Sequence, residues 1–172
     1  MSRSVFIAVA GCLVFGGCSG DGGSAASTTV VNAALPIVDQ IDDAVAALEA
    51  ELGGPQEYFE INATPQLVNL FVAMELATAV QPWVYLDGGL SSEEPQAAQG
   101  GTLLGTDLDF DPATIFSQLQ SELPGATVES FYIHGNGEGG VQYGALLTTA
   151  QGGAIDVQLR SDGQIISSEP LN

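Results

Sequence analysis

Three carboxylates alternate with apolar residues in the segment 107–111, which reads Asp-Leu-Asp-Phe-Asp. Carboxylate oxygens at this spacing could converge on a hard cation, because calcium takes about six to eight oxygen ligands. A calcium loop that opens in this way also needs a glycine at its sixth position and a glutamate at its twelfth, where this chain has Pro112 and Gln118. We therefore interpret Asp107, Asp109 and Asp111 as solvated charges, retain them only as weak candidates for metal ligands, and predict no metal site and no cofactor.

His134 is the single histidine of the chain, and Ser130, Glu129 and Glu138 lie near it in sequence. Nucleophilic catalysis by serine needs a histidine and an acid brought to the same place, usually with the serine on a Gly-x-Ser-x-Gly turn, and the chain lacks that turn. We therefore expect a structural role for His134 and predict no catalytic residue. Among 21 Asp and Glu residues some pair will always resemble a hydrolase dyad, so an acidic hydrolase is the least favoured interpretation.

The charge of the chain is strongly negative, with 2 Lys and Arg against 21 Asp and Glu, and a net charge of -19 at pH 7. Phosphate backbones are bound chiefly through Lys and Arg, so this composition argues against nucleic-acid binding. The negative charge favours solubility, or alternatively an affinity for cations or for a basic partner. The hydrophobic content of 45% is that of a sequence that folds.

The N-terminus combines one cation, Arg3, with an apolar run from Val5 to Phe15 and the small residues Gly16 and Gly17. This order is typical of a secretory signal peptide. The apolar run is much shorter than the roughly 20 residues that a membrane-spanning helix needs. We therefore predict that residues 1–17 are a signal peptide.

The residues that follow the apolar run resemble the lipobox of bacterial lipoproteins, in which small residues precede a cysteine that becomes linked to diacylglycerol. Gly16, Gly17 and Cys18 match this pattern, whereas Phe15 stands where Leu, Val or Ile is usual. The resemblance implies a lipid on Cys18 and a protein anchored to the outer face of the cell membrane. Two alternatives remain, namely lipidation at Cys12 after a shorter apolar run, and an ordinary signal peptide with an incidental cysteine.

Beyond a Gly/Ser-rich tether, residues 18–30, the chain shows helix and strand patterns. Apolar residues recur every three or four positions from Val31 to Leu52 and predict a helix that ends at Gly53. Asp111 and Pro112 have the types of an N-cap and a first helical residue, and predict a second helix that ends before 124–125. Strands are expected at 57–62, 80–86, 127–133, 141–149 and 155–160, with hairpin turns at 87–89 and 161–164.

Three features of these patterns leave choices open. Residues 67–77 could form a helix that begins at Thr64 and Pro65, or a strand, and we favour the strand. Pro82 suggests an edge position or a bulge. The aromatic pairs 58–59 and 83–85 could line a groove for a sugar or a peptide, but core packing is the more ordinary role.

The two halves of the chain contain the same parts in the same order. Residues 48–52 and 119–123 correspond at an offset of 71, residues 58–59 and 131–132 at 73, residues 68–70 and 141–143 at 73, and residues 87–88 and 162–163 at 75. We interpret this as a tandem duplication, with coincidence as the alternative. The predicted fold class is α+β, with two tandem helix-plus-antiparallel-strands units, 31–92 and 111–172, each helix packed on a curved sheet, and a connector at 93–110.

The hairpin pattern of residues 154–166, behind a helix and two strands, looks like the exported PepSY-type and cystatin-like domains. In those domains a helix lies across a curved antiparallel sheet. The resemblance implies an inhibitory or ligand-binding role and assigns no residue. The leading functional hypothesis is therefore a non-enzymatic, lipid-anchored binding domain of the cell envelope, held in the membrane by Cys18, with a protein or peptide partner. The apolar run 67–74 supports an alternative, a carrier of an apolar ligand such as a lipid.

Overall fold

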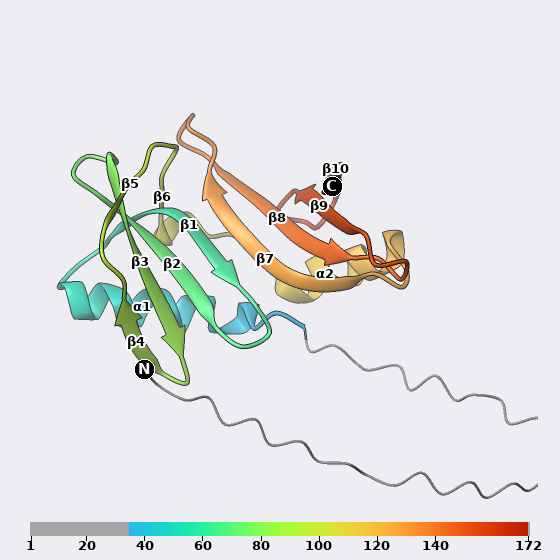
Figure 1. Ribbon diagram of the computed structural model, residues 1–172, viewed down its shortest axis with the longest axis horizontal. Helices are drawn as coiled ribbons and strands as arrows, with labels where there is room; N and C mark the ends of the chain where they lie inside the picture. The colour runs from blue at the N-terminus through green and yellow to red at the C-terminus, as the bar shows by residue number, and fades with distance from the viewer. Residues whose placement is uncertain (1–34, 172) are drawn as a thin grey trace, which may run out of the picture. The chain divides into compact units, whose positions relative to one another are not determined.

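A computed structural model describes residues 35–171, in which two helices lie against one antiparallel sheet (Figure 1). The predicted signal peptide, Cys18, the whole of the tether and residues 31–34 of the predicted first unit lie outside these residues. The mixed helix-and-sheet architecture expected from the sequence is confirmed. Within residues 35–171 no helix has the length and apolar character needed to cross a membrane.

The helical elements are the short 3-10 helix η1 (Val38–Gln40), α1 (Ile41–Leu52), the 3-10 helix η2 (Gly105–Asp107) and α2 (Pro112–Glu122). The strands are β1 (Glu57–Ala63), β2 (Val68–Met74), β3 (Ala79–Leu86), β4 (Gly89–Ser92), β5 (Gln96–Ala97), β6 (Leu103–Leu104), β7 (Thr127–Gly135), β8 (Val141–Thr148), β9 (Ala154–Leu159) and β10 (Ile165–Leu171). The main order across the sheet is β10-β9-β8-β7-β1-β2-β3-β4, with β5 beside β3 and β6 beside β1.

The first helix begins later than the apolar periodicity predicted. Residues 35–37 are not helical, and the backbone N–H of Ile37 donates to the carbonyl of Thr64 at 3.0 Å. Pro36 explains the late start, because proline disfavours helical geometry at the residue before it. The predicted end is confirmed, since Gly53 has a φ of 82° and closes the helix with a hydrogen bond to the carbonyl of Glu49.

Within the ambiguous segment 67–77, Val68–Met74 forms strand β2, which pairs with β1 and β3, and residues 75–77 belong to the following turn. The favoured strand is therefore confirmed. Thr64 and Pro65 begin a tight turn instead of a helix. The side-chain oxygen of Thr64 accepts the backbone N–H groups of Gln66 at 3.3 Å and Leu67 at 3.2 Å. A threonine that caps a turn uses the same short-range bonds as a helix N-cap, so the local signal was the same for both structures.

Pro82 lies in an interior strand, but at a place where the ladder on one side is interrupted. β3 pairs with β2 through residues 79–85, while its other side pairs with β4 through residues 83–86 and with β5 through residues 79–80. The carbonyl of Pro82 accepts the N–H of Glu93 at 2.9 Å, so its backbone polar groups face this interrupted side. The missing N–H of proline therefore removes no bond between β2 and β3.

Strands from the two halves of the chain meet at the centre of the sheet, where β1 pairs antiparallel with β7. β1 and β7 share a local irregularity, a register shift at 58–60 in β1 and at 128–130 in β7. The segment 93–110, expected as a connector, also adds β5 and β6 to this sheet and buries Leu103.

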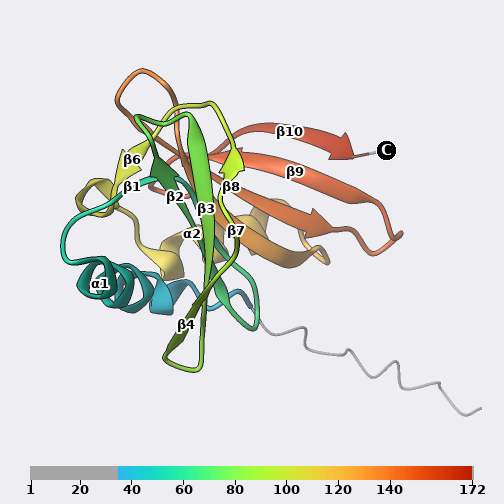
Figure 2. The ribbon, with the colours of Figure 1, turned by 60° about the vertical axis from the view of Figure 1, so that its left-hand side comes forward.

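Both helices pack against the same face of the sheet, as Figure 2 shows with α1 and α2 on one side of the strands. Their buried residues and the alternate residues of β1, β2, β7, β8 and β9 form one hydrophobic core. Tyr58, predicted to pack in the core, is fully buried there. The opposite surface of the sheet is called the open face below. It is not covered by any helix of residues 35–171.

Candidate functional site

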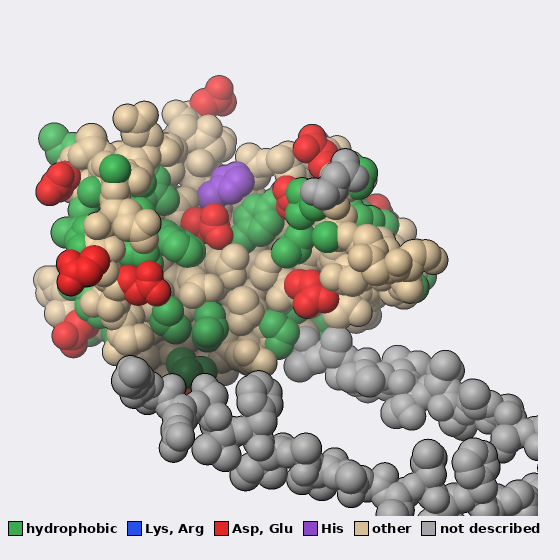
Figure 3. Space-filling model, viewed as in Figure 1, with side chains coloured by type: hydrophobic (Ala, Val, Ile, Leu, Met, Phe, Trp, Pro, Cys, Tyr) green, Lys and Arg blue, Asp and Glu red, His purple; other side chains and the backbone are tan. Residues whose placement is uncertain are grey.

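The open face carries polar side chains where β1, β7, β8 and β9 lie side by side. Successive residues of a strand point to opposite faces, so the neighbours of the buried core residues point away from the helices. The register places Asn62, Tyr132, Gly144 and Gln158 in one row, and Glu60, His134 and Gln142 in the next. We define the polar cluster as Glu60, Asn62, Tyr132, His134 and Asp156. In Figure 3 the single histidine lies beside acidic side chains, with hydrophobic side chains around them.

Tyr132 reaches across a neighbouring strand to Asp156. Its hydroxyl donates to Oδ1 of Asp156 at 2.5 Å, although β8 runs between the two residues. Gly144 of β8 permits this, because a Cβ at that position would lie 2.2 Å from Cζ of Tyr132. Burial, the hydrogen bond to Asp156 and the negative charges of Asp156 and Glu60 all raise the pKa of Tyr132.

Glu60, Asn62 and His134 complete the polar cluster. His134 is the cross-strand partner of Glu60, and its ring stacks on that of Tyr132 with centroids 5.7 Å apart. The amide Nδ2 of Asn62 donates to Oε1 of Glu60 at 3.3 Å, whereas the buried Oδ1 of Asn62 has no hydrogen-bond partner within residues 35–171. The carboxylate opposite His134 is thus Glu60, which is distant in sequence, and not one of the acids that neighbour it along the chain.

An apolar groove adjoins the polar cluster on the open face. We use this name for the hollow of about 210 Å³ that is lined mainly by Phe59, Phe71 and Val80, with Glu60 at its rim. Phe59 points into this groove because its neighbour Tyr58 is buried and β1 is irregular at this point. The prediction that Phe59 packs in the core is therefore wrong, and the alternative role in a groove describes its position.

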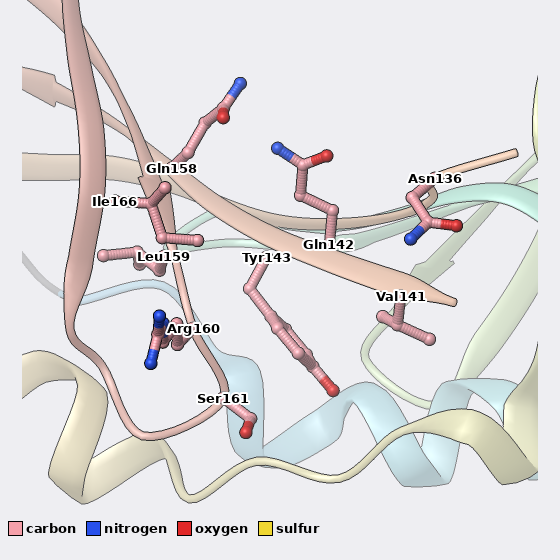
Figure 4. A pocket seen from close by; sticks show the side chains of 9 residues that line it. All are labelled: Asn136, Val141, Gln142, Tyr143, Gln158, Leu159, Arg160, Ser161 and Ile166. Carbon is pink, nitrogen blue, oxygen red and sulfur yellow. The ribbon is translucent and has the colours of Figure 1, made fainter. Parts of the chain in front are cut away.

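A larger hollow, of about 500 Å³, lies where β8 begins and β9 ends, beside the start of β10 (Figure 4). Arg160, the one Lys or Arg of residues 35–171, contributes to its lining. Figure 4 shows Gln142 and Gln158 on one side of the strands and the ring of Tyr143 on the other. These polar groups do not converge on a common point, so we regard the polar cluster and the apolar groove as the stronger site.

The structure does not bring the three predicted metal candidates together. Asp107 accepts the backbone N–H of Leu104 at 2.8 Å, and the backbone of Asp109 bonds to the hydroxyl of Tyr143. Asp111 is the N-cap of α2, as its place before Pro112 predicted, and its hydrogen bond with Thr114 lowers its pKa. Among the residues that the structure describes, no group of three or more His, Cys, Asp or Glu side chains could hold a metal ion.

Sequence reasoning did not identify Glu60, Asn62, Tyr132 or Asp156 as members of one site. Two signals were present, namely the polar alternation of residues 155–159 and a glycine inside the strand at position 144. A glycine in a strand often marks a close approach by another group. The identity of that group, however, depends on which strands are neighbours.

Comparison with known proteins places the fold but not the function. No family model matches the chain, and no curated protein matches its sequence. The PepSY-type and cystatin-like resemblance therefore has no family match behind it. A similar fold occurs in the crystal structure of a candidate lipoprotein from Clostridium difficile 630, with 11% identity and a TM-score of 0.54 over 80% of this chain and 94% of that one. At this identity the likeness concerns the fold alone.

Proposed function

We propose that this protein is a lipid-anchored, non-enzymatic binding protein of the cell envelope, whose open face recognises a protein or peptide partner. The observation that carries this proposal is the adjacency of the polar cluster and the apolar groove on one sheet surface, with Glu60 belonging to both. Side chains on paired strands are held in position, so such a surface is preorganised for binding.

The polar cluster is better suited to hydrogen bonding than to catalysis. The raised pKa of Tyr132 keeps its hydroxyl protonated at neutral pH, and a protonated hydroxyl is a weak nucleophile and a weak base. Asp156 is already engaged by Tyr132, and Glu60 by Asn62. The remaining donor and acceptor positions on an open surface can bind a partner without a chemical step.

Anchoring depends on Cys18, which lies outside the described residues. The tether between Cys18 and the folded part is rich in Gly and Ser, and about 11 such residues have an r.m.s. reach of roughly 18 Å. Two acyl chains on one residue hold a protein on a membrane far more firmly than one chain does. The folded part would then work on the outer face of the membrane, within the reach of this tether.

An apolar carrier is less well supported by the packing. The layer between the helices and the sheet is filled by buried side chains, including Leu48, Leu119 and Phe131. Of the apolar run 67–74, Val68, Leu70 and Val72 are part of that core. An apolar ligand would have to displace these residues, whereas a partner on the open face would not.

We also infer that the chain arose by tandem duplication of a helix-plus-strands unit, with units at 31–92 and 111–172 joined by 93–110. The buried positions 44, 45 and 48 of α1 correspond to 115, 116 and 119 of α2 at an offset of 71. The register shifts at 58–60 in β1 and 128–130 in β7 support an offset of 70 between these two strands. This offset aligns Ile61 with Phe131, whereas the sequence pattern alone aligned Tyr58 with Phe131. The alternation of buried residues in β2 and β8 likewise supports an offset of 75 between these two strands, which aligns Val68 with Tyr143.

Site-specific crosslinking in cells tests the binding function. Benzoylphenylalanine in place of Phe71 puts a photoreactive group on the open face, and the same residue in place of Leu52, which is 40% exposed, puts it on the helical side. We expect a discrete adduct from position 71 that position 52 does not give. The same adducts from both positions, or none from position 71, would contradict a partner on the open face.

A further inference from the structure

We infer that the partner presents an extended, cationic peptide segment to the open face, with one apolar side chain in the apolar groove and basic side chains on Glu60 and Asp156. This inference rests on the proposed binding function and specifies its ligand. The two subsites meet at Glu60, which forms the rim of the groove and also bonds to Asn62 in the polar cluster.

Charge complementarity favours a cationic partner. Of the 21 Asp and Glu residues only Asp21 precedes the described residues, which contain a single Lys or Arg, Arg160. Arg160 lies at the end of β9, in the lining of the larger hollow, and not in the polar cluster. A surface of this kind attracts basic segments and repels anionic ones over about 8–10 Å at physiological ionic strength.

The polar cluster offers acceptors to a ligand that carries donors. Tyr132 engages one oxygen of Asp156 and leaves the other for a partner. Asn62 in turn engages one oxygen of Glu60 through its Nδ2, so the second carboxylate oxygens of Asp156 and Glu60 remain for a partner. Oδ1 of Asn62 is closed to solvent and is not offered to a ligand on the surface.

The spacing of the two carboxylates favours an extended chain over a small molecule. Glu60 is on β1 and Asp156 is on β9, three strands away, and their rows differ by four residues along β7. With about 4.8 Å between strands and about 3.3 Å per residue, the two positions are separated by roughly 20 Å. An extended chain covers this distance in roughly six residues, and the groove lies on the far side of Glu60 from Asp156.

Binding of a designed peptide to the full-length protein in detergent tests this inference. The probe is the dye-labelled peptide Phe-Ser-Lys-Ser-Thr-Ser-Thr-Ser-Lys, compared with versions that carry Glu for both Lys residues or Ser for Phe. We expect anisotropy to report binding of the first peptide alone, with weaker binding at high salt. Glu60→Gln should weaken binding about two- to fivefold, as for loss of one exposed ion pair. Phe71→Ala should also weaken it, whereas Glu51→Gln on the exposed side of α1 should not.

The outcomes separate this inference from the proposed function. Equal binding of the Glu-containing peptide, or binding that Glu60→Gln and Phe71→Ala leave unchanged, would overturn the inference. If none of the peptides binds but crosslinking from position 71 still gives a discrete adduct, the inference of a cationic segment is overturned. The proposed function, a partner on the open face, is then retained. Circular dichroism melting of each variant establishes that the fold is retained, so that a loss of binding refers to the surface.

Discussion

The hydroxyl of Tyr132 and Oδ1 of Asp156 lie 2.5 Å apart across an intervening strand, and this bond joins β7 to β9 over the backbone of Gly144. The contact depends on a missing side chain, because any Cβ at position 144 would overlap the tyrosine ring. It therefore connects a sequence feature, a glycine within a strand, to the geometry of the candidate site.

We expect Gly144→Ala to displace the ring of Tyr132 and break its bond to Asp156. The ring can swing outward, so the expected loss in the free energy of unfolding is modest, about 1 kcal/mol, and comparable with that of Tyr132→Phe. Urea denaturation measures both. Gly89→Ala is the matched control, because its Cβ would meet only the carbonyl of Leu86, at 3.5 Å. If Gly144→Ala costs as much in a Tyr132→Ala background, the steric explanation is wrong.

Stability should fall in alkaline solution because folding holds protons on tyrosines. Burial, with the nearby Glu49, raises the pKa of Tyr58, and burial and Asp156 raise that of Tyr132. Above the ordinary pKa of about 10 the unfolded chain releases these protons while the folded chain retains them, so stability falls by up to about 1.4 kcal/mol per pH unit for each tyrosine. Below that pH the contribution is fully present.

Urea denaturation between pH 8 and pH 11 measures this slope. Tyr132→Phe should make the decline in stability above pH 10 shallower, because the folded variant then holds one proton fewer that the unfolded chain would release. A wild-type stability that is flat over this range would contradict raised tyrosine pKa values.

Asp111 should act as a helix cap and not as a metal ligand. Its side chain accepts the N–H of Ala113 at 3.2 Å and the hydroxyl of Thr114 at 2.5 Å. Asp111→Ala should therefore lower the melting temperature, whereas Asp111→Asn, which keeps a capping oxygen, should change it little. Because the pKa of Asp111 is lowered in the folded state, the stabilisation should be lost as the pH falls through the acidic range.

Calcium distinguishes the two roles of this segment. Added calcium should not shift the melting temperature of the wild-type protein or of Asp109→Asn. A calcium-dependent rise that disappears in Asp109→Asn would restore the metal-site interpretation for residues 107–111.

Lipidation should occur at Cys18. We expect labelled palmitate to enter the wild-type protein and the Cys12→Ser variant, but not Cys18→Ser, which should also leave the membrane fraction. Label in Cys18→Ser that is lost in Cys12→Ser would move the anchor to the earlier cysteine. An unlabelled wild-type protein would indicate an ordinary signal peptide and remove the anchoring part of the proposed function.

Local patterns were sufficient for most of the elements. Two of these patterns reflect short-range backbone energetics, namely the glycine after Leu52 that ends α1 and the N-cap at Asp111. A third, the apolar alternation of Val68, Leu70 and Val72, indicates which face of a strand is buried. Such signals act over a few residues and can be read directly from the order of side chains. They left a choice open where one local signal serves two structures, as at Thr64, and they failed where a bulge changes the alternation, as at Phe59.

The site depended on contacts between residues far apart in the chain. Glu60 lies opposite His134 because β1 pairs with β7. Tyr132 reaches Asp156 because β9 pairs with β8 and because Gly144 of β8 leaves room for the tyrosine ring. A strand pattern specifies which residues share a face but leaves the neighbouring strand and its register open. Those are set by packing of the whole core under two helices, so the amino-acid order predicted the faces, and only the folded chain brought the polar cluster together.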